Sequence, residues 1–389
     1  MTVALGRIIF PVVSSSNPRE PQMSPHVVVT GATGFVGAAL VSELLEQTDA
    51  TVTCVVRHRD GDDPDSRLQR RLQRTFFDHE QPHLEDVARE RVRAVVGDLT
   101  DPGLADLAAE LGPVDAVWHS AASLKYRDQD ADEILSHNVE GTRNILALAA
   151  TTGAAEFNHV STAYVAGRRR GVIREEAVPA GTRYNNQYER SKIEGEALVV
   201  ASGMRTRVFR PSIVVGHSRT RRADSDAGVY GFLQDLKRFA RTSGTRGDDA
   251  RPLNIAARAD TGVNLVSVDA VASSAVEISL SSSSAGFFHL TNGHTAPVRE
   301  AISMVCEVLD LPAPNFTDEL RQLTREDRLL NRYLDFYLPY LGGERIFDRT
   351  NTDAVVGSRC DLPLDPAEQR AIVTTWLTQD DVVVGGTRP

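Results

Sequence analysis

The chain lacks any apolar run near 18 residues, so its sequence predicts no membrane-spanning helix. Its three cysteines, Cys54, Cys306 and Cys360, are too few and too scattered for a disulfide framework or a metal cluster. It has no basic excess either, because 43 Lys and Arg residues face 53 Asp and Glu residues, for a net charge of -10. This balance disfavours nonspecific nucleic-acid binding. We therefore expect a cytoplasmic protein without metal or nucleic-acid partners.

The bulk composition is that of a globular protein. Of 389 residues, 41% are hydrophobic and 25% are charged, which is enough for a large α/β domain with a second lobe. Residues 1–25 are rich in serine and proline and carry no secretory signal pattern. We expect this segment to be a disordered extension, with Met23 as an alternative start.

From His26 onward, short β-branched runs alternate with helical segments, which is the pattern of a parallel sheet covered on both faces. The fold class is therefore α/β: a Rossmann-type doubly wound parallel sheet with a smaller, mainly helical C-terminal substrate-binding lobe. Residues 26–215 should form the nucleotide-binding domain, joined by returning segments at about 262–292, and residues 216–261 and 293–389 the lobe. Strands are expected at 26–30, 51–57, 91–97, 114–120, 156–161 and 205–212, and a charged surface helix without assigned function at 61–74.

The first strand runs directly into the glycine-rich sequence TGATGFVG, followed by an amphipathic helix. Gly31, Gly34 and Gly37 would allow a tight turn and a close approach of the backbone to a pyrophosphate, which the helix N-terminus stabilises. The spacing G-x-x-G-x-x-G differs from the commonest dinucleotide fingerprint, but its place between strand and helix predicts dinucleotide binding.

Basic residues follow the second strand, where NAD-binding proteins often carry an acidic residue for the ribose hydroxyl. Arg57 and Arg59 could instead bind a 2′-phosphate, which favours NADPH over NADH. The alternative is a solvated basic loop. Asp98, after the third strand, could accept a hydrogen bond from the adenine amino group or could be a turn residue.

Tyr188 and Lys192 are spaced i, i+4, which places both side chains on one helix face. Reduction of a carbonyl builds an alkoxide that needs a proton, and a cation beside a phenol lowers the pKa of that phenol. We therefore expect Tyr188 to be the acid/base and Lys192 to lower its pKa. Thr162, with Ser161 beside it at the end of the fifth strand, should polarise the carbonyl.

The motifs TGATGFVG, GDLTDP, HSAAS, HNVEGTRNIL, STAYVAG, YERSK and RPSIVVG, in this order, resemble those of an extended short-chain dehydrogenase/reductase. The resemblance covers roughly residues 26–292 and implies an NAD(P) cofactor, with Thr162, Tyr188 and Lys192 as catalytic hydroxyl, acid/base and ribose-binding cation. It also places Asn138 where related enzymes hold a proton-relay water, although a residue that satisfies local backbone is the alternative. The motif positions expected to contact the cofactor are Thr30, Gly31, Thr33, Gly34, Phe35, Val36, Gly37, Arg57, Arg59, Asp98, Leu99, Ser120, Ala121, Ala122, Lys192, Pro211, Ser212 and Ile213.

Two further features are similar to the thioester-reductase and fatty acyl-CoA reductase branch of this family. One is STAYVAG together with NNQYERSKIEGE, and the other is the tail segment 339–354, in which Phe347, Asp348 and Asn351 match a short FDxxNT pattern. The branch implies NADPH-dependent reduction of an acyl thioester, held on coenzyme A or on the phosphopantetheine of a carrier protein, to an aldehyde or alcohol. The alternatives are a ketoreductase, epimerase or dehydratase acting on a hydroxyl or ketone, such as a nucleotide-sugar or polyketide-like intermediate, and a dinucleotide-sensing scaffold.

Two arginine clusters lie outside the catalytic motifs, at Arg168–Arg170 and at Arg219, Arg221 and Arg222. They could pair with substrate phosphates, or they could be solvated loop charges. The family resemblance also implies a monomer or homodimer.

Overall fold

The computed structural model describes residues 24–243, 251–281, 285–317, 319, 321 and 323–383, with side chains described to residue 379. The predicted disordered extension and the alternative start at Met23 fall on residues outside this range, except for Ser24 and Pro25. Among the helices of the described residues, none is long and apolar enough to cross a membrane.

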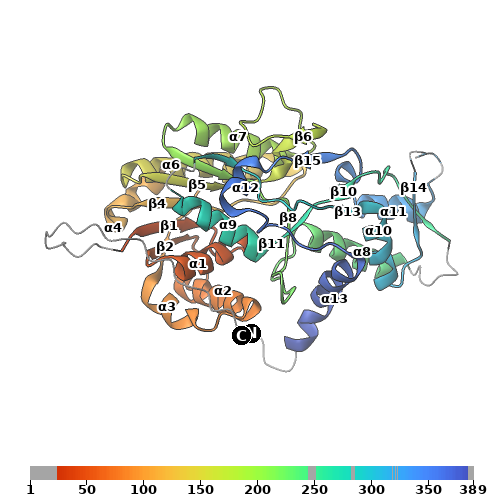
Figure 1. Ribbon diagram of the computed structural model, residues 1–389, viewed down its shortest axis with the longest axis horizontal. Coiled ribbons are helices and arrows are strands. Elements are labelled where there is room, and N and C mark those ends of the chain that lie inside the picture. The colour runs from red at the N-terminus through yellow and green to blue at the C-terminus, as the bar shows by residue number, and fades with distance from the viewer. Residues whose placement is uncertain are drawn as a thin grey trace, which may run out of the picture.

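A seven-stranded parallel sheet forms the centre of the larger part of the molecule (Figure 1). The strand order is β12-β7-β5-β4-β1-β2-β3, which confirms the predicted Rossmann-type doubly wound fold. All six strands expected in the first part of the chain are present; the first has the expected bounds, and the other five are shorter by one to three residues. The bounds are β1 (His26–Thr30), β2 (Thr51–Val56), β3 (Val92–Val96), β4 (Ala116–His119), β5 (Glu156–Val160), β7 (Arg205–Phe209) and β12 (Gly286–Phe288).

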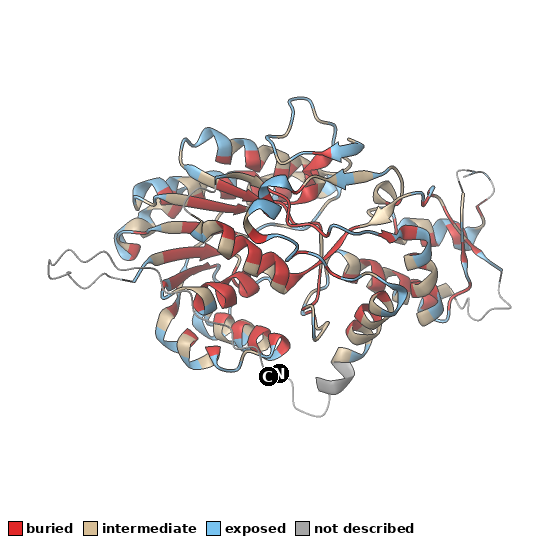
Figure 2. Ribbon diagram, viewed as in Figure 1, coloured by how far each residue is buried: buried red, intermediate tan, exposed pale blue. Residues whose placement is uncertain are grey.

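Helices cover both faces of this sheet, so its inner strands are buried on both sides (Figure 2), whereas the edge strand β3 is partly exposed. In β1, Val27 and Val29 contribute to the core on one face and Val28 to the core on the other. The first face carries α1 (Phe35–Gln47), α2 (Pro64–His79), α3 (Leu84–Arg91) and α9 (Val268–Leu280). The second carries η1 (Pro102–Leu107), α4 (Ala108–Leu111), α5 (Ala131–Leu135), α6 (Gly141–Thr151) and α7 (Gln187–Ala201).

Helix α2 is the charged helix expected at 61–74, and it begins and ends slightly later than predicted. Its arginines are exposed or half-buried, while Leu68, Leu72 and Phe76 are fully buried in the core beside α1. The helix therefore belongs to the nucleotide-binding domain rather than being a detached surface insertion.

A second, smaller hydrophobic core lies beyond the carboxyl ends of the sheet strands. It is built by α8 (Val229–Ser243), β9 (Leu253–Ile255), α10 (Val298–Val308), β14 (Pro314–Phe316), α11 (Arg325–Tyr333) and α13 (Pro366–Val383). Short strand pairs connect this core to the sheet domain: β8 (Ile213–Val215) with β11 (Leu265–Ser267), β10 (Gly262–Val263) with β13 (Ala296–Pro297), and β6 (Gly171–Ile173) with β15 (Arg345–Phe347).

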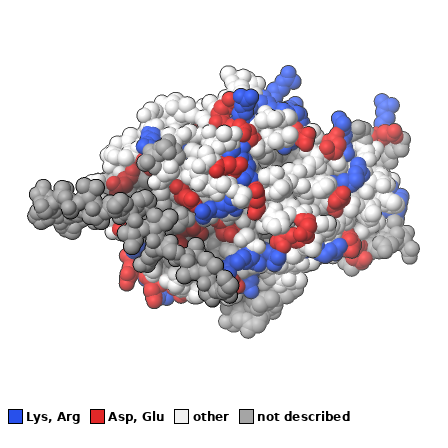
Figure 3. Space-filling view, viewed as in Figure 1, with Lys and Arg blue, Asp and Glu red and all other residues white. Residues whose placement is uncertain are grey.

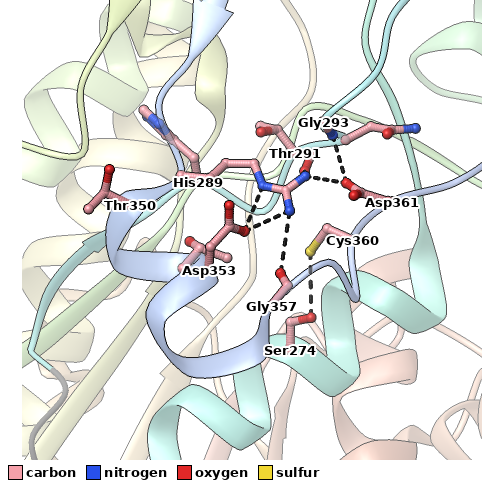
Figure 4. Close-up of polar contacts among 12 residues, drawn as sticks. Ser274, His289, Thr291, Gly293, Thr350, Asp353, Gly357, Cys360 and Asp361 are labelled. Atoms are coloured by element: carbon pink, nitrogen blue, oxygen red, sulfur yellow. Dashed lines mark hydrogen bonds and ion pairs between the residues drawn. The ribbon is translucent and has the colours of Figure 1, made fainter.

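Part of the C-terminal segment packs on the sheet domain rather than on the second core. Helix α12 (Thr350–Val356) returns to the sheet domain and packs against α9 and β12. Arg349 fixes this return, because its guanidinium binds the carboxylates of Asp353 and Asp361 and donates to the carbonyl oxygen of Thr291 at 2.9 Å (Figure 4). The boundaries drawn from the sequence remain a prediction, but segment 349–361 lies against the sheet domain.

Candidate active site

A cavity of about 1160 Å³ runs from the carboxyl ends of the sheet strands into the second core. All the predicted catalytic and cofactor-binding residues line it except Thr30 and Asn138. Its far wall is apolar and comes from the second core, through Phe232, Val298, Ile302 and Val373 among others. The volume exceeds the usual range for one small ligand, roughly 300–1,000 Å³.

The glycine-rich turn between β1 and α1 has no room for side chains. Gly31 has φ of +76°, and a Cβ there would lie 2.6 Å from the backbone nitrogen of Ala121. A Cβ on Gly37 would lie 2.1 Å from the carbonyl oxygen of Gly31. Helix α1 begins after Gly34 without a side-chain cap, so its first N–H groups face the cavity and can bind an anion. The turn therefore fits the pyrophosphate of a dinucleotide.

Thr30 supports this turn from below rather than lining the cavity. It is completely buried, and its Oγ1 accepts a hydrogen bond from the N–H of Ala121 and bonds Nδ1 of His119 at 2.8 Å. Because Thr30 ties β1 to the loop after β4, its role is to position the backbone that the cofactor would meet.

Three arginines gather at the cavity beside the end of β2: the predicted Arg57 and Arg59, and Arg67 from α2. Arg67 donates to the carbonyl oxygen of Arg57, and its Nη1 is buried without a hydrogen-bond partner among the described residues. Burial first, and then the charge of Arg59, lower the pKa of Arg67. Sequence reasoning missed Arg67 because it treated the charged helix as solvated.

Asp98 lines the cavity and is also a turn residue, so both of its expected roles are compatible with its position. Its Oδ1 accepts hydrogen bonds from the N–H and hydroxyl of Thr100, at 2.9 and 2.8 Å. Burial raises the pKa of this carboxyl, but these hydrogen bonds and the charge of Arg57 outweigh burial and hold it below its usual range.

Tyr188 and Lys192 both line the cavity from the first two turns of α7, which Asn186 caps by accepting a hydrogen bond from the N–H of Glu189. The spacing suggested that the charge of Lys192 acts on the Tyr188 phenol, but the ammonium is bonded to the backbone instead. Its ammonium donates to the carbonyl oxygen of Val160 at 2.8 Å, and burial lowers the pKa of the lysine to about 8.

The pKa of Tyr188 is raised to about 12, because burial disfavours the phenolate and the adjacent Glu189 carboxylate repels it. This differs from the lowered value expected from the sequence. The phenol is therefore protonated throughout the neutral range, which suits a proton donor.

Three hydroxyl groups face the same end of the cavity. Ser161, Thr162 and Ser212 are buried, and the Oγ atoms of Ser161 and Ser212 have no hydrogen-bond partner among the described residues. Oγ1 of Thr162 accepts from the N–H of Tyr164 at 3.2 Å and keeps its own hydrogen free to donate. Unpaired buried hydroxyls are costly, so this end of the cavity fits a ligand with polar groups.

Asn138 does not reach the cavity. It lies in the π-helical segment η3 (Ser136–Glu140), where its side chain bonds both the N–H and the carbonyl of Ser123 and donates to Oγ of Ser191 at 2.8 Å. These contacts favour the structural alternative for Asn138, because its amide holds the loop after β4 against α7.

An aromatic wall closes the cavity next to Tyr188. Tyr340 packs edge-on against Tyr164 with a ring separation of 5.0 Å, and its hydroxyl donates to the fully buried carboxylate of Glu189 at 2.7 Å. Tyr126 from the loop after β4 contacts Phe336, with rings 4.3 Å apart. Sequence reasoning assigned no role to these residues, although the tail motif YLPYLGG contains Tyr340.

The six arginines of the two loop clusters all belong to the described part of the chain, and none of them lines the cavity. Arg221 forms two hydrogen bonds with Glu368, and Arg219 pairs with Glu80 at 3.3 Å. The guanidinium of Arg222 lies 4.7 Å from the ring centre of Phe77. The second cluster is therefore occupied by internal contacts. The cavity instead receives Arg345, from β15, which the sequence did not single out.

Comparisons with known proteins agree with this architecture. The sequence pattern of the male sterility protein family, an NAD-binding family, matches residues 29–275. A linear gramicidin synthase of Brevibacillus parabrevis is 28% identical over 264 residues, which is 64% of this chain but 5% of the synthase. Fatty acyl-CoA reductase 1 of Xenopus laevis is 35% identical over 147 residues, 36% of this chain and 28% of the reductase. The chain thus spans a minor part of the curated relatives it matches.

Among solved structures, the terminal R domain from the myxalamid PKS-NRPS biosynthetic pathway aligns over 93% of both chains, with a TM-score of 0.72 and 24% identity. This likeness supports the fold, and the family match supports a nicotinamide cofactor, which the glycine turn and the buried hydroxyls fit. The chain belongs to the male sterility protein family, an NAD-binding family whose model matches more than half of the chain's length.

Proposed function

We propose that the protein reduces an acyl thioester with NADPH. The observation that carries this proposal is the continuous cavity, which joins the dinucleotide turn, the Thr162, Tyr188 and Lys192 side chains, and the apolar wall of the second core. A dinucleotide would fill the end near α1, and an acyl chain suits the apolar end. One of the relatives is named a fatty acyl-CoA reductase, which points to the same chemistry.

In this proposal a reduced nicotinamide supplies the hydride. Hydride adds to the thioester carbonyl carbon, and the carbonyl electron pair moves onto oxygen, which Thr162 stabilises by donating a hydrogen bond. Tyr188 gives its proton to that oxygen, which its raised pKa allows because an alkoxide is the stronger base. The C–S bond then breaks while the proton on that oxygen passes to the leaving sulfur, so an aldehyde and a free thiol leave, and solvent returns a proton to Tyr188. A second hydride transfer of the same kind would give an alcohol.

The preference for NADPH rests on Arg57, Arg59 and Arg67, which line the cavity at the end of β2. A charge-assisted hydrogen bond contributes about 1.5–3 kcal/mol, so Arg57→Gln should weaken NADPH binding about tenfold to a hundredfold and leave NADH binding nearly unchanged. Arg143→Gln is the control, because Arg143 is exposed and pairs with Glu140 away from the cavity. Equal losses for both nucleotides would contradict the NADPH assignment.

The reaction is tested by following NADPH consumption and thiol release together. Acyl-CoA and acyl-carrier substrates should give one thiol for each NADPH when the aldehyde is the product, and Tyr188→Phe should abolish both signals. Turnover of a ketone or a sugar nucleotide without thiol release would support the alternative reductase, epimerase or dehydratase function. NADPH binding without turnover of any class would support a dinucleotide-sensing role.

A further inference from the structure

Strand β15 places two side chains on the cavity side and one on the outside. Arg345 and Phe347 line the cavity, while Ile346 between them is 51% exposed. The strand pairs with β6, with Arg345 opposite Gly171. The guanidinium of Arg345 therefore enters the cavity near the aromatic wall of Tyr164 and Tyr340.

Arg345 is poorly satisfied in this position. Its Nη2 and Nη1 reach the carbonyl oxygens of Gly167 and Gly343 at 3.3 and 3.5 Å, which are long hydrogen bonds, and its Nε is buried without a partner. Within the described residues, no carboxylate oxygen lies at ion-pair distance from it. The Glu189 carboxylate acts on Arg345 from beyond that distance, and it raises the pKa of Arg345 less than burial and Arg170 lower it. A half-buried cation with no carboxylate in contact is costly, so the arrangement favours an anionic ligand.

A second guanidinium lies on the outer side of the same turn. Arg170 packs so closely on Gly343 that a Cβ there would meet its Nε at 1.9 Å. Arg170 is exposed, and it lowers the pKa of Arg345 further after the larger effect of burial. Asp260, a carboxylate near this turn, is already bound by Arg258 at 2.7 Å and by the N–H of Gly343. Two like charges thus flank Gly343 without a shared carboxylate among the described residues.

The surface around this turn is rich in positive charge. Figure 3 shows Lys and Arg side chains, interspersed with Asp and Glu, along the upper edge of the molecule, in the region of β6 and β15. Arg168, Arg170 and Arg174 are all exposed in this stretch of chain. The Arg345–Arg170 pair therefore spans the boundary between the cavity and a basic surface, although the chain as a whole is acidic.

We propose that Arg345 and Arg170 bind the phosphate at the outer end of the arm that carries the thioester, the 4′-phosphate that coenzyme A and carrier-protein phosphopantetheine share. This inference rests on the proposed function and extends it to the recognition of the substrate arm. In both carriers this phosphate is substituted at a second oxygen, so it offers two non-bridging oxygens to the two guanidinium groups, and it stays partly solvated at the cavity boundary while the apolar acyl group lies inside. A carboxylate on the acyl chain is not the anion expected at Arg345, because the acyl chain would place it at the apolar end of the cavity.

Three thioesters of one acyl group separate the possibilities: S-acyl pantetheine, which has no phosphate, S-acyl 4′-phosphopantetheine, which has one, and the acyl-CoA. Arg345→Gln should raise KM about tenfold for the two phosphorylated substrates, with little change in kcat and no change for the pantetheine thioester. Arg170→Gln should act in the same direction but less, because its guanidinium is solvated. Arg174→Gln, an exposed arginine beside β6, is the matched control.

The outcomes have distinct meanings. An equal loss on all three substrates would overturn the phosphate site and make Arg345 a structural residue of the aromatic wall. A loss on acyl-CoA alone would overturn the assignment to the shared phosphate and point to the nucleotide phosphates of coenzyme A. An effect on acyl-carrier protein equal to that on S-acyl 4′-phosphopantetheine would support the shared phosphate as the group bound.

A binding measurement separates this inference from the proposed reaction. Calorimetry with 4′-phosphopantetheine and with pantetheine needs no turnover, and only the phosphorylated compound should bind more weakly to Arg345→Gln. If no thioester is reduced but this difference appears, the proposed function fails and the phosphate site stands. If Arg345→Gln does not fold, the exposed Arg170→Gln carries the same comparison, and identical binding of both compounds to it and to the unmodified chain would overturn the site.

Discussion

The proton of Lys192 should set the pH dependence of the enzyme. The ammonium is buried and bonded to the Val160 carbonyl oxygen, and its pKa is lowered from 10.5 to about 8. The Tyr188 phenol stays protonated over the same range because its pKa is about 12. If the reaction needs both the ammonium and the phenol, kcat/KM for the nucleotide should be highest below about pH 8. Above that pH it should fall tenfold for each pH unit.

Stability should change in the opposite direction over the same pH window. Lys192 holds its proton less tightly in the folded than in the unfolded chain, so the unfolded chain binds more protons between about pH 8 and 10.5. The free energy of unfolding therefore rises with pH across this window. The fall in pKa from 10.5 to about 8 multiplied by about 1.4 kcal/mol per pH unit gives about 3.5 kcal/mol for this group.

Two measurements check this reasoning: a profile of kcat/KM for NADPH from pH 6 to 10, and urea unfolding at matching pH values. Lys192→Arg keeps the positive charge, so any activity it retains should lose the fall near pH 8. Lys192→Met should flatten the rise of stability between pH 8 and 10.5. A flat activity profile up to pH 10, together with a pH-independent stability difference between Lys192→Met and the unmodified chain, would refute the role given to this ammonium.

Three further substitutions follow from the geometry. Gly31→Ala should abolish nucleotide binding and lower the free energy of unfolding by about 2 kcal/mol or more, because the new Cβ would meet the backbone of Ala121. The control is Gly112→Ala, where φ is +67° but the space is open; it should lower the free energy of unfolding by about 1 kcal/mol and leave binding intact. Nucleotide titration and urea unfolding measure the two effects. Arg349→Met should lower the free energy of unfolding by about 3 kcal/mol, because the carboxylates of Asp353 and Asp361 lose their ion pairs with the guanidinium. Arg370→Met, at an exposed ion pair, should lower it by less than about 1 kcal/mol, and urea unfolding measures both. Tyr340→Phe should lower kcat several-fold without changing nucleotide affinity, because the buried Glu189 carboxylate, next to the phenol proposed as proton donor, loses a donor; unchanged kcat would exclude that link.

Local patterns predicted the sheet and much of the site. The β-branched runs predict the buried strands, the glycine and hydroxyl motifs lie where these strands end, and Tyr-x-x-x-Lys lies in the first two turns of α7. Parallel strands bring their carboxyl ends to one edge, so Gly31, Thr162 and Tyr188 converge although they are far apart in the chain. This convergence follows from the fold class alone.

The outer wall of the cavity could not be predicted in the same way. Tyr340 and Arg345 reach the site only because β15 pairs with β6, a contact between segments about 170 residues apart that no periodicity encodes. Arg67 faces the nucleotide end because one side of α2 packs on the core, which places the arginine beside the end of β2. In both cases, tertiary packing decides which of the many arginines of the chain line the cavity.

The spacing of Tyr188 and Lys192 does not determine the acidity of the Tyr188 phenol. An i, i+4 interval fixes the distance between two Cβ atoms, but the long lysine side chain carries its charge to an acceptor chosen by the surrounding backbone, here the carbonyl of Val160. The next residue, Glu189, is completely buried and repels a phenolate at position 188. Burial and this carboxylate therefore decide the acidity of the phenol, in favour of its protonated form. A phenol that is kept protonated in this way is better suited to giving a proton to a new alkoxide than to removing one from an alcohol, which agrees with a reduction.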